Sequence, residues 1–133
     1  MPKPILCLDF DGVIHSYMSG WKGADTIPDP IVPGFFAFLL EAQSHFDVQI
    51  FSSRSHQPGG IVAMLDYLYK EATNCLIHEA DFDLPRVIDA LDDIKWPTQK
   101  PPAMLTIDDR ALTFTGNWPA VEQLLSFKPW NKS

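Results

Sequence analysis

The sequence has few basic residues, few cysteines and no long apolar run, and each shortage excludes a class of protein. Ten Lys and Arg residues stand against 17 Asp and Glu, for a formal net charge of −7. A general nucleic-acid-binding surface needs clustered cations and is therefore not expected. Two cysteines cannot form a disulfide framework, so we expect reduced thiols and a cytoplasmic location. No apolar run approaches the roughly 20 residues of a membrane helix, and no secretory signal is visible.

Histidine is scarce as well, and its placement is uninformative about metals. The four histidines are scattered along the chain without the close spacing of a zinc site (His15, His45, His56 and His78). What is plentiful is apolar sequence, at 46% of 133 residues, without repeats or low-complexity segments. This length and composition predict one soluble domain over residues 1–133.

The most informative stretch is an apolar strand that ends in two aspartates. The strand is predicted over residues 4–10, where an apolar run reaches Asp9, and Asp11 and Gly12 follow closely. Such a run fits a strand buried on both faces of a parallel sheet. Because open α/β sheets bind ligands at the carboxyl ends of their strands, we expect Asp9 and Asp11 to lie in a functional site.

The remaining segments alternate between helical and strand patterns. Helices are predicted over 34–45, 61–72, 85–94 and 119–127, and buried strands over 48–51 and 103–107. The segment 74–99 is harder to interpret, and residues 75–77 could form a short strand. The alternation predicts a Rossmann-like α/β fold with a parallel sheet and helices on both faces.

Residues 14–33 interrupt this alternation with several glycines and prolines, which forbid a long helix. We expect a loop or hairpin here, called the flap below, lying over the two carboxylates. His15 and Trp21 on the flap are candidate substrate contacts. The intervals between the predicted elements leave no room for a large cap domain.

The strand ends carry groups suited to phosphoryl transfer. Carboxylates held close together must take up protons or share a cation, and with oxygen ligands only that cation should be Mg²⁺. Asp9 could attack phosphorus, while Asp11 protonates the leaving alcohol and then deprotonates water. Ser52, after the second strand, could donate to a phosphoryl oxygen, and Lys100 could supply a positive charge. Asp108 and Asp109 follow the predicted strand at 103–107 and could complete the metal site.

Four motifs in order resemble those of the haloacid dehalogenase-like superfamily of phosphohydrolases. They are Asp9-Phe10-Asp11-Gly12-Val13, Phe51-Ser52-Ser53-Arg54, Lys100-Pro101-Pro102-Ala103 and Ile107-Asp108-Asp109-Arg110-Ala111. The resemblance implies that Asp9 is the nucleophile and a metal ligand, and that Asp11 binds Mg²⁺ through its backbone carbonyl. It also implies that Asp108 and Asp109 complete the metal site. Relatives with Asp at the position of Asp11 are typically phosphatases or phosphotransferases, so dehalogenation is not expected.

Some assignments stay open at this point. Ser53 could serve in place of Ser52, and Lys95 in place of Lys100. Arg54 could touch the leaving group or be a structural ion-pair partner of the acidic residues.

The expected function is a minimal, capless phosphatase that hydrolyses a phosphomonoester, with a phosphorylated small molecule as its substrate. One alternative is a 3′-end phosphatase, with nucleic acid present only as a substrate end. A second is a non-catalytic module that binds a phosphorylated partner. A response-regulator-type phosphoacceptor domain is disfavoured by the order of the acidic motifs. The natural substrate, the pathway and the oligomeric state do not follow from the sequence.

Overall fold

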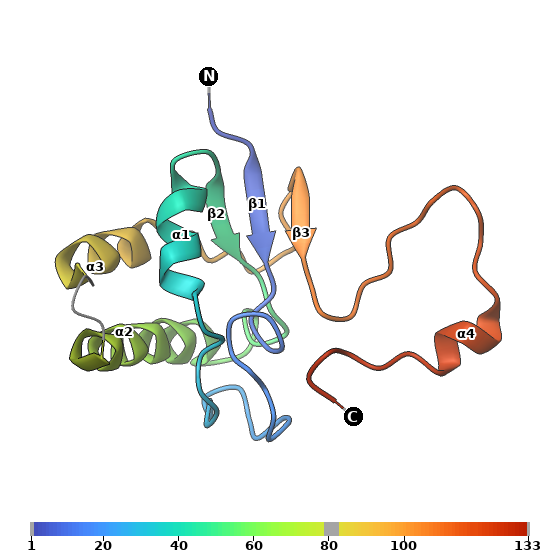
Figure 1. Ribbon diagram of the computed structural model, residues 1–133, viewed down its shortest axis with the longest axis horizontal. Helices are drawn as coiled ribbons and strands as arrows, with labels where there is room; N and C mark the ends of the chain where they lie inside the picture. The colour runs from blue at the N-terminus through green and yellow to red at the C-terminus, as the bar shows by residue number, and fades with distance from the viewer. Residues whose placement is uncertain (1, 79–82, 133) are drawn as a thin grey trace.

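The computed structural model describes residues 2–78 and 83–132, and it builds them around a small parallel sheet (Figure 1). The sheet has the order β2-β1-β3, with β1 at Ile5–Leu8, β2 at Asp47–Ile50 and β3 at Leu105–Ile107. Both pairings are parallel, and Leu8 lies opposite Ile50 on one side and Ile107 on the other. An isolated parallel bridge between Gln49 and Lys95 extends the pattern beyond β2. The predicted α/β class with a parallel sheet is therefore confirmed.

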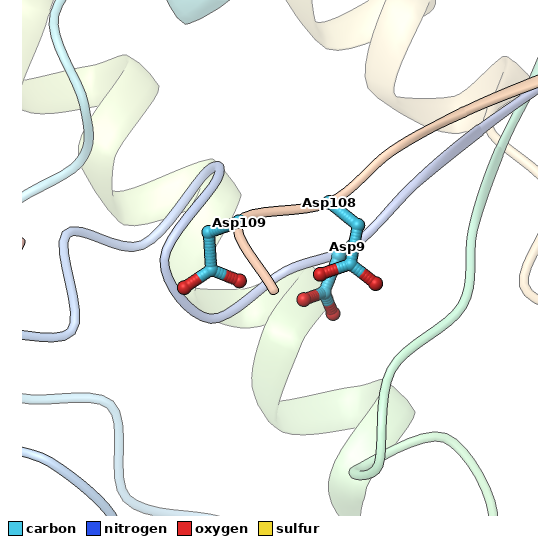
Figure 2. A group of neighbouring side chains, drawn as sticks. All are labelled: Asp9, Asp108 and Asp109. Atoms are coloured by element: carbon cyan, nitrogen blue, oxygen red, sulfur yellow. The ribbon is translucent and has the colours of Figure 1, made fainter. Parts of the chain in front are cut away.

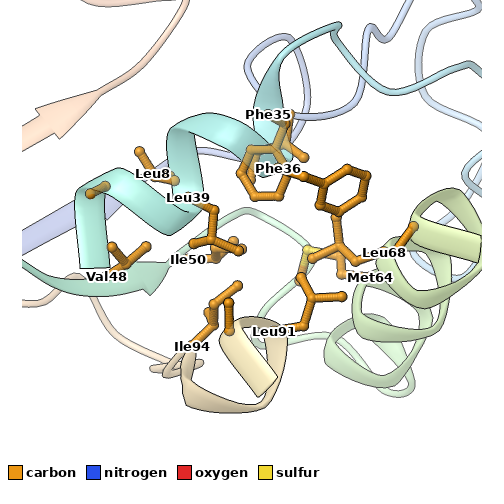
Figure 3. Close-up of a cluster of buried hydrophobic side chains, with 14 of the residues drawn as sticks. Leu8, Phe35, Phe36, Leu39, Val48, Ile50, Met64, Leu68, Leu91 and Ile94 are labelled. Atoms are coloured by element: carbon orange, nitrogen blue, oxygen red, sulfur yellow. The ribbon is translucent and has the colours of Figure 1, made fainter. Parts of the chain in front are cut away.

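Three helices cover one face of this sheet: α1 at Phe35–Gln43, α2 at Gly60–His78 and α3 at Leu84–Asp93. Asp83 caps α3 by accepting a hydrogen bond from the backbone N–H of Arg86 at 3.2 Å. Leu8, Val48 and Ile50 point into a core shared with Leu39 of α1 and Leu91 of α3 (Figure 3). These five side chains are at most 2% exposed, so the core that fixes β1 and β2 is well packed.

The prediction of helices on both faces is wrong for the described residues. Leu8 and Ile50 pack with residues of α1, α2 and α3, so all three helices lie on one face of the sheet. Cys7 and Gln49 alternate with them along the strands and point to the other face, where both are buried without one of these helices. The fourth helix, α4 at Val121–Leu125, stands apart from the sheet at the end of a long loop (Figure 1). None of its residues is buried, so the predicted inward packing of Val121, Leu124 and Leu125 is wrong.

The expected burial of the strand at 103–107 is also wrong. All three residues of β3 are exposed, because β3 is an edge strand and α4 does not cover it. The suggested strand at 75–77 is wrong too, since those residues continue α2. No Gly or Pro occurs between Ile61 and His78, so nothing in the sequence ends the helix earlier. Among the described residues, no helix combines the length and the apolarity that crossing a membrane requires.

The flap closes on itself at its base. His15 bridges Ile31 in antiparallel fashion, the N–H of Ser16 donates to the Pro30 carbonyl, and the N–H of Val32 donates to the Ile14 carbonyl. The flap therefore leaves and rejoins the body next to the end of β1.

Candidate active site

The site lies where the ends of β1 and β3 meet. The chain passes from β1 to β2 on one side and later adds β3 on the other, so the sheet order reverses between β1 and β3. Such a switch point leaves a crevice beyond the strand ends, where open α/β sheets bind ligands. The N–H of Asp9 donates to the Ile107 carbonyl at 3.0 Å, which holds the two strand ends together.

Three carboxylates gather at this point: Asp9 after β1, and Asp108 and Asp109 after β3 (Figure 2). One oxygen from each can be chosen so that all lie within 4.8 Å of one another. Residues from two separate parts of the chain thus converge as the strand-end pattern predicts.

Asp109 is the most constrained of the three. Its side chain is only 2% exposed, and both carboxylate oxygens are buried without a hydrogen-bond partner among the described residues. Burial and repulsion from Asp108 raise the pKa of Asp109. A buried carboxylate without donors is costly unless a cation or a proton neutralises it.

Gly12 makes this placement of Asp109 possible. A Cβ on Gly12 would lie 2.1 Å from Oδ2 of Asp109, and Gly12 has a φ of +82°. Both the close approach and the left-handed backbone require glycine.

The charged form of Asp9 is also disfavoured in this cluster. Burial, together with repulsion from the carboxylates of Asp108, Asp109 and Asp11, raises the pKa of Asp9 to about 7 against one opposing contact. That contact is the Phe10 N–H, which donates to Oδ1 of Asp9 at 2.8 Å. A cation between these carboxylates would reverse the effect, since it favours the charged forms.

The donor set fits a hard divalent cation. It consists of carboxylate oxygens only, whereas zinc and other softer metals are usually bound through nitrogen or sulfur. Asp9, Asp108 and Asp109 could hold Mg²⁺ here. The buried Asp109 oxygens, which have no hydrogen-bond partner among the described residues and only a 3.9 Å ion pair with the exposed Arg110, are a second observation that points to a cation.

Asp11 lies in a different environment from this trio. Its Oδ1 is 2.9 Å from Nδ1 of His15, and its Oδ2 accepts from Nε of Arg54 at 2.9 Å. Burial alone would raise the pKa of Asp11, but hydrogen bonds from His15 and Arg54 outweigh it and lower that pKa. Asp9 and Asp11 are two residues apart and yet have pKa values shifted in opposite directions.

Arg54 joins Asp11 to the flap. Its side chain is fully buried, and Nη1 donates to the carbonyls of Gly23, Ala24 and Thr26 at 2.8, 3.0 and 3.2 Å. Trp21 covers the guanidinium, with its ring centroid 4.7 Å from Cζ. Of the two roles considered for Arg54, these contacts favour that of a structural ion-pair partner over that of a contact with the leaving group.

The other predicted flap contacts are placed as follows. His15 is fully buried between Asp11 and Asp29, so it does not present its ring to solvent. Trp21 is 44% exposed, and its ring lies on the guanidinium of Arg54.

Of the two serines after β2, Ser52 is integrated into the strand-end turn. It is 3% exposed, its Oγ accepts from the Arg54 N–H at 3.2 Å, and its own N–H donates to Oγ of Ser55 at 2.9 Å. These bonds leave the Ser52 hydroxyl hydrogen available for a phosphoryl oxygen. Ser53 is exposed, so Ser52 is the better-oriented candidate.

The two candidate lysines occupy different environments. Lys95 pairs with Asp47, the first residue of β2, at 3.0 Å and is therefore committed at the opposite end of the strand. Lys100 is exposed on the segment before β3, and Lys100 and Asp9 both lie close enough to the Cys7 thiol to affect its pKa. The pairing of Lys95 with Asp47 thus leaves Lys100 as the better candidate.

Three residues that shape the site were not predicted from the sequence. Gly12 was part of the first motif but was assigned no function, although a glycine directly after Asp-x-Asp indicates a tight turn. Asp29 lies in a proline-rich stretch, where no pattern points to His15. Trp130 donates from Nε1 to the Gly12 carbonyl at 2.6 Å, a contact between residues 118 positions apart.

Comparisons with known proteins gave no relatives. No family model matches the chain, and neither the curated proteins nor the solved structures contain a significant match.

Proposed function

We propose that the protein is a Mg²⁺-dependent phosphomonoester hydrolase of the haloacid dehalogenase type, acting through an aspartyl-phosphate on Asp9. The observation that carries the proposal is the convergence of Asp9 with Asp108 and Asp109 at the switch point of the sheet, where the buried Asp109 oxygens lack a hydrogen-bond partner among the described residues. The motif resemblance supports it, as do the hydroxyl of Ser52 in the turn after β2 and the exposed Lys100 before β3.

Asp9, Asp108 and Asp109 would hold the metal ion, which when bound would neutralise charge on the phosphoryl oxygens and keep Asp9 ionised. Ser52 and Lys100 would orient the same phosphoryl group through a hydrogen bond and a positive charge. A capless site with a flap of this size leaves the phosphate accessible from solvent.

In the first step an oxygen of Asp9 forms a bond to phosphorus while the bond between phosphorus and the ester oxygen breaks. A proton brought by the substrate phosphate monoanion passes by way of the Asp11 carboxylate to that leaving oxygen. In the second step water attacks phosphorus, Asp11 accepts a proton from the water, and the bond between Asp9 and phosphorus breaks. Phosphate leaves and Asp9 is regenerated.

The lowered pKa of Asp11 shapes this sequence. The resting side chain is a carboxylate, already suited to deprotonate water in the second step. The proton for the first step therefore has to arrive with the substrate, whose phosphate monoanion carries one near neutral pH.

The test is a panel of phosphomonoesters assayed with Mg²⁺ and with EDTA, together with Asp9→Asn and Asp11→Asn. We expect turnover that EDTA abolishes, a loss of at least about a thousandfold in Asp9→Asn, and a loss of about 10²–10⁴-fold in Asp11→Asn. Activity that survives Asp9→Asn would exclude the covalent mechanism. An oligonucleotide with a 3′-phosphate belongs in the panel, and turnover of it alone would favour the 3′-end phosphatase.

A non-catalytic module gives a different result in the same experiment. It would turn over no substrate but would still bind inorganic phosphate in a Mg²⁺-dependent manner, as calorimetry can measure.

A further inference from the structure

The imidazole of His15 is firmly held beside the candidate site, and the proposed reaction assigns it no part. The side chain is fully buried. The rings of Phe10, Tyr17 and Tyr67 surround it, with centroids 5.9, 5.8 and 5.5 Å from its own. Such packing leaves the imidazole a single orientation, so its two nitrogens have defined partners.

The hydrogen bonds of His15 assign its tautomer. Nε2 accepts from the backbone N–H of Asp29 at 3.1 Å, and a ring nitrogen that accepts carries no hydrogen. The hydrogen is therefore on Nδ1, which donates to Oδ1 of Asp11 at 2.9 Å. The reverse arrangement would aim Nε2–H at Oδ2 of Asp29, but that distance is 3.6 Å. This oxygen already accepts from the Ser19 N–H at 2.7 Å.

Asp11 is consequently held from two directions. His15 donates to one carboxylate oxygen, and Arg54 donates to the other at 2.9 Å. The last torsion of an aspartate side chain is otherwise broad, so these two donors define how its plane is turned. Each oxygen retains a second lone pair that can exchange a proton with a ligand.

We propose that His15 is a positioning residue that holds the Asp11 carboxylate in the orientation needed for proton transfer. The inference rests on the proposed function, in which Asp11 carries the proton. Proton transfer requires heavy-atom distances of about 2.6–3.2 Å, so a carboxylate that rotates freely spends less time within reach of the leaving oxygen. Since Asp29 belongs to the flap, the placement of His15, and through it of Asp11, depends on the flap contact at Asp29.

Two substitutions of similar size separate the two hydrogen bonds of His15. Asn places its amide N–H near the position of Nδ1 and keeps the donor to Asp11, whereas Gln places its amide near Nε2 and keeps only the flap side. We expect His15→Gln to lower kcat about 10–100-fold with KM changed less than about threefold, because substrate binding does not use this contact. His15→Asn should recover kcat to within about fivefold of wild type. His45→Gln, at an exposed histidine, is the control and should leave kcat unchanged.

Wild-type kcat in His15→Gln, or an equal loss in His15→Asn and His15→Gln, would overturn the inference. Long-range ¹H–¹⁵N spectra of the wild-type protein test it without relying on a variant that folds: Nδ1 must carry the hydrogen, and a hydrogen on Nε2 would overturn it. If the wild type turns over no phosphomonoester, the proposed function fails instead, and the spectra still decide the His15 tautomer.

Discussion

At the scale of single residues, Gly12 and Asp109 depend on each other. A side chain at Gly12 would enter the space of the Asp109 carboxylate, which has no hydrogen-bond partner among the described residues and only a 3.9 Å ion pair with the exposed Arg110. The short Asp109 side chain can move aside, but only by leaving the group that it forms with Asp9 and Asp108. Function should therefore be more sensitive than stability at this position.

We predict that Gly12→Ala weakens Mg²⁺ binding by more than about tenfold while lowering the free energy of unfolding by about 1–3 kcal/mol. Gly20→Ala is the matched control, since Gly20 has a similar φ of +75° and no atom lies within 4 Å of the position that its Cβ would occupy. The control should show the backbone strain alone, about 1–2 kcal/mol, with unchanged Mg²⁺ affinity. Titration calorimetry and chemical denaturation measure the two quantities, and equal affinities in both variants would contradict the prediction.

Replacing Asp109 should have opposite effects on the stability of the metal-free and the metal-bound protein. Asp109→Asn removes a buried charge, so we expect the metal-free protein to become more stable by about 1 kcal/mol. The same change removes a ligand, so the rise in melting temperature on adding Mg²⁺ should largely disappear. Asp89→Asn, on α3 and away from the cluster, should change neither quantity. A full Mg²⁺ response in Asp109→Asn would exclude this residue as a ligand.

At the scale of elements, the flap and the loop after β2 form one hydrogen-bonded unit. Arg54 supplies the connection, because one end of its guanidinium binds Asp11 and the other binds three flap carbonyls. Tyr67 of α2 adds a hydrogen bond to the Asp29 carbonyl at 2.8 Å. The flap is thus tied to the loop after β2, to Asp11 and to α2.

We predict that Arg54→Lys destabilises the protein by about 2–4 kcal/mol, because a single ammonium cannot serve Asp11 and the flap together in a buried site. The amide of Asp29, which donates to His15, should exchange its hydrogen faster as the flap opens more often. Arg86→Lys, at an exposed position, is the control. Unchanged protection of the Asp29 amide in Arg54→Lys would show that the flap is held by other contacts.

At the scale of the whole molecule, we expect the acidic cluster to link stability to pH and, through the proposed metal site, to Mg²⁺. The pKa of Asp9 is raised from 3.8 to about 7, so between these values the folded protein holds a proton that the unfolded chain has released. The stability of the metal-free protein must then fall as the pH rises through this window. Asp11 acts in the opposite sense, since its lowered pKa contributes stability that is lost only at more acidic pH.

We predict that the melting temperature in EDTA is higher at about pH 5 than at about pH 8, and that Mg²⁺ raises it more at the higher pH. Metal binding requires the deprotonated carboxylates, so protons and Mg²⁺ compete for the same site. Asp9→Asn isolates this contribution from that of the histidines and should flatten the profile between about pH 4 and 7. A wild-type profile that matches that of Asp9→Asn would contradict the raised pKa.

The local sequence was sufficient for β1, β2, α1 and α3. Their apolar periodicity and their capping residues act over a few positions, and the structure has them within a few residues of the predicted ranges. The sequence also indicated that Asp9 and Asp108-Asp109 follow strands, and parallel strands bring their carboxyl ends to one edge. That is why the acidic cluster could be predicted from the sequence.

Only the tertiary structure decided which faces are covered and which partners each side chain has. The apolar residues of β3 and α4 resemble core segments, but burial depends on a neighbour, and the described residues bring none against them. Likewise, Asp9 and Asp11 have pKa values shifted in opposite directions. Asp9 is buried beside the carboxylates that follow β3, whereas Asp11 accepts hydrogen bonds from His15 and Arg54. Sequence determined which chemical groups reach the strand ends, and long-range packing determined what each group can do there.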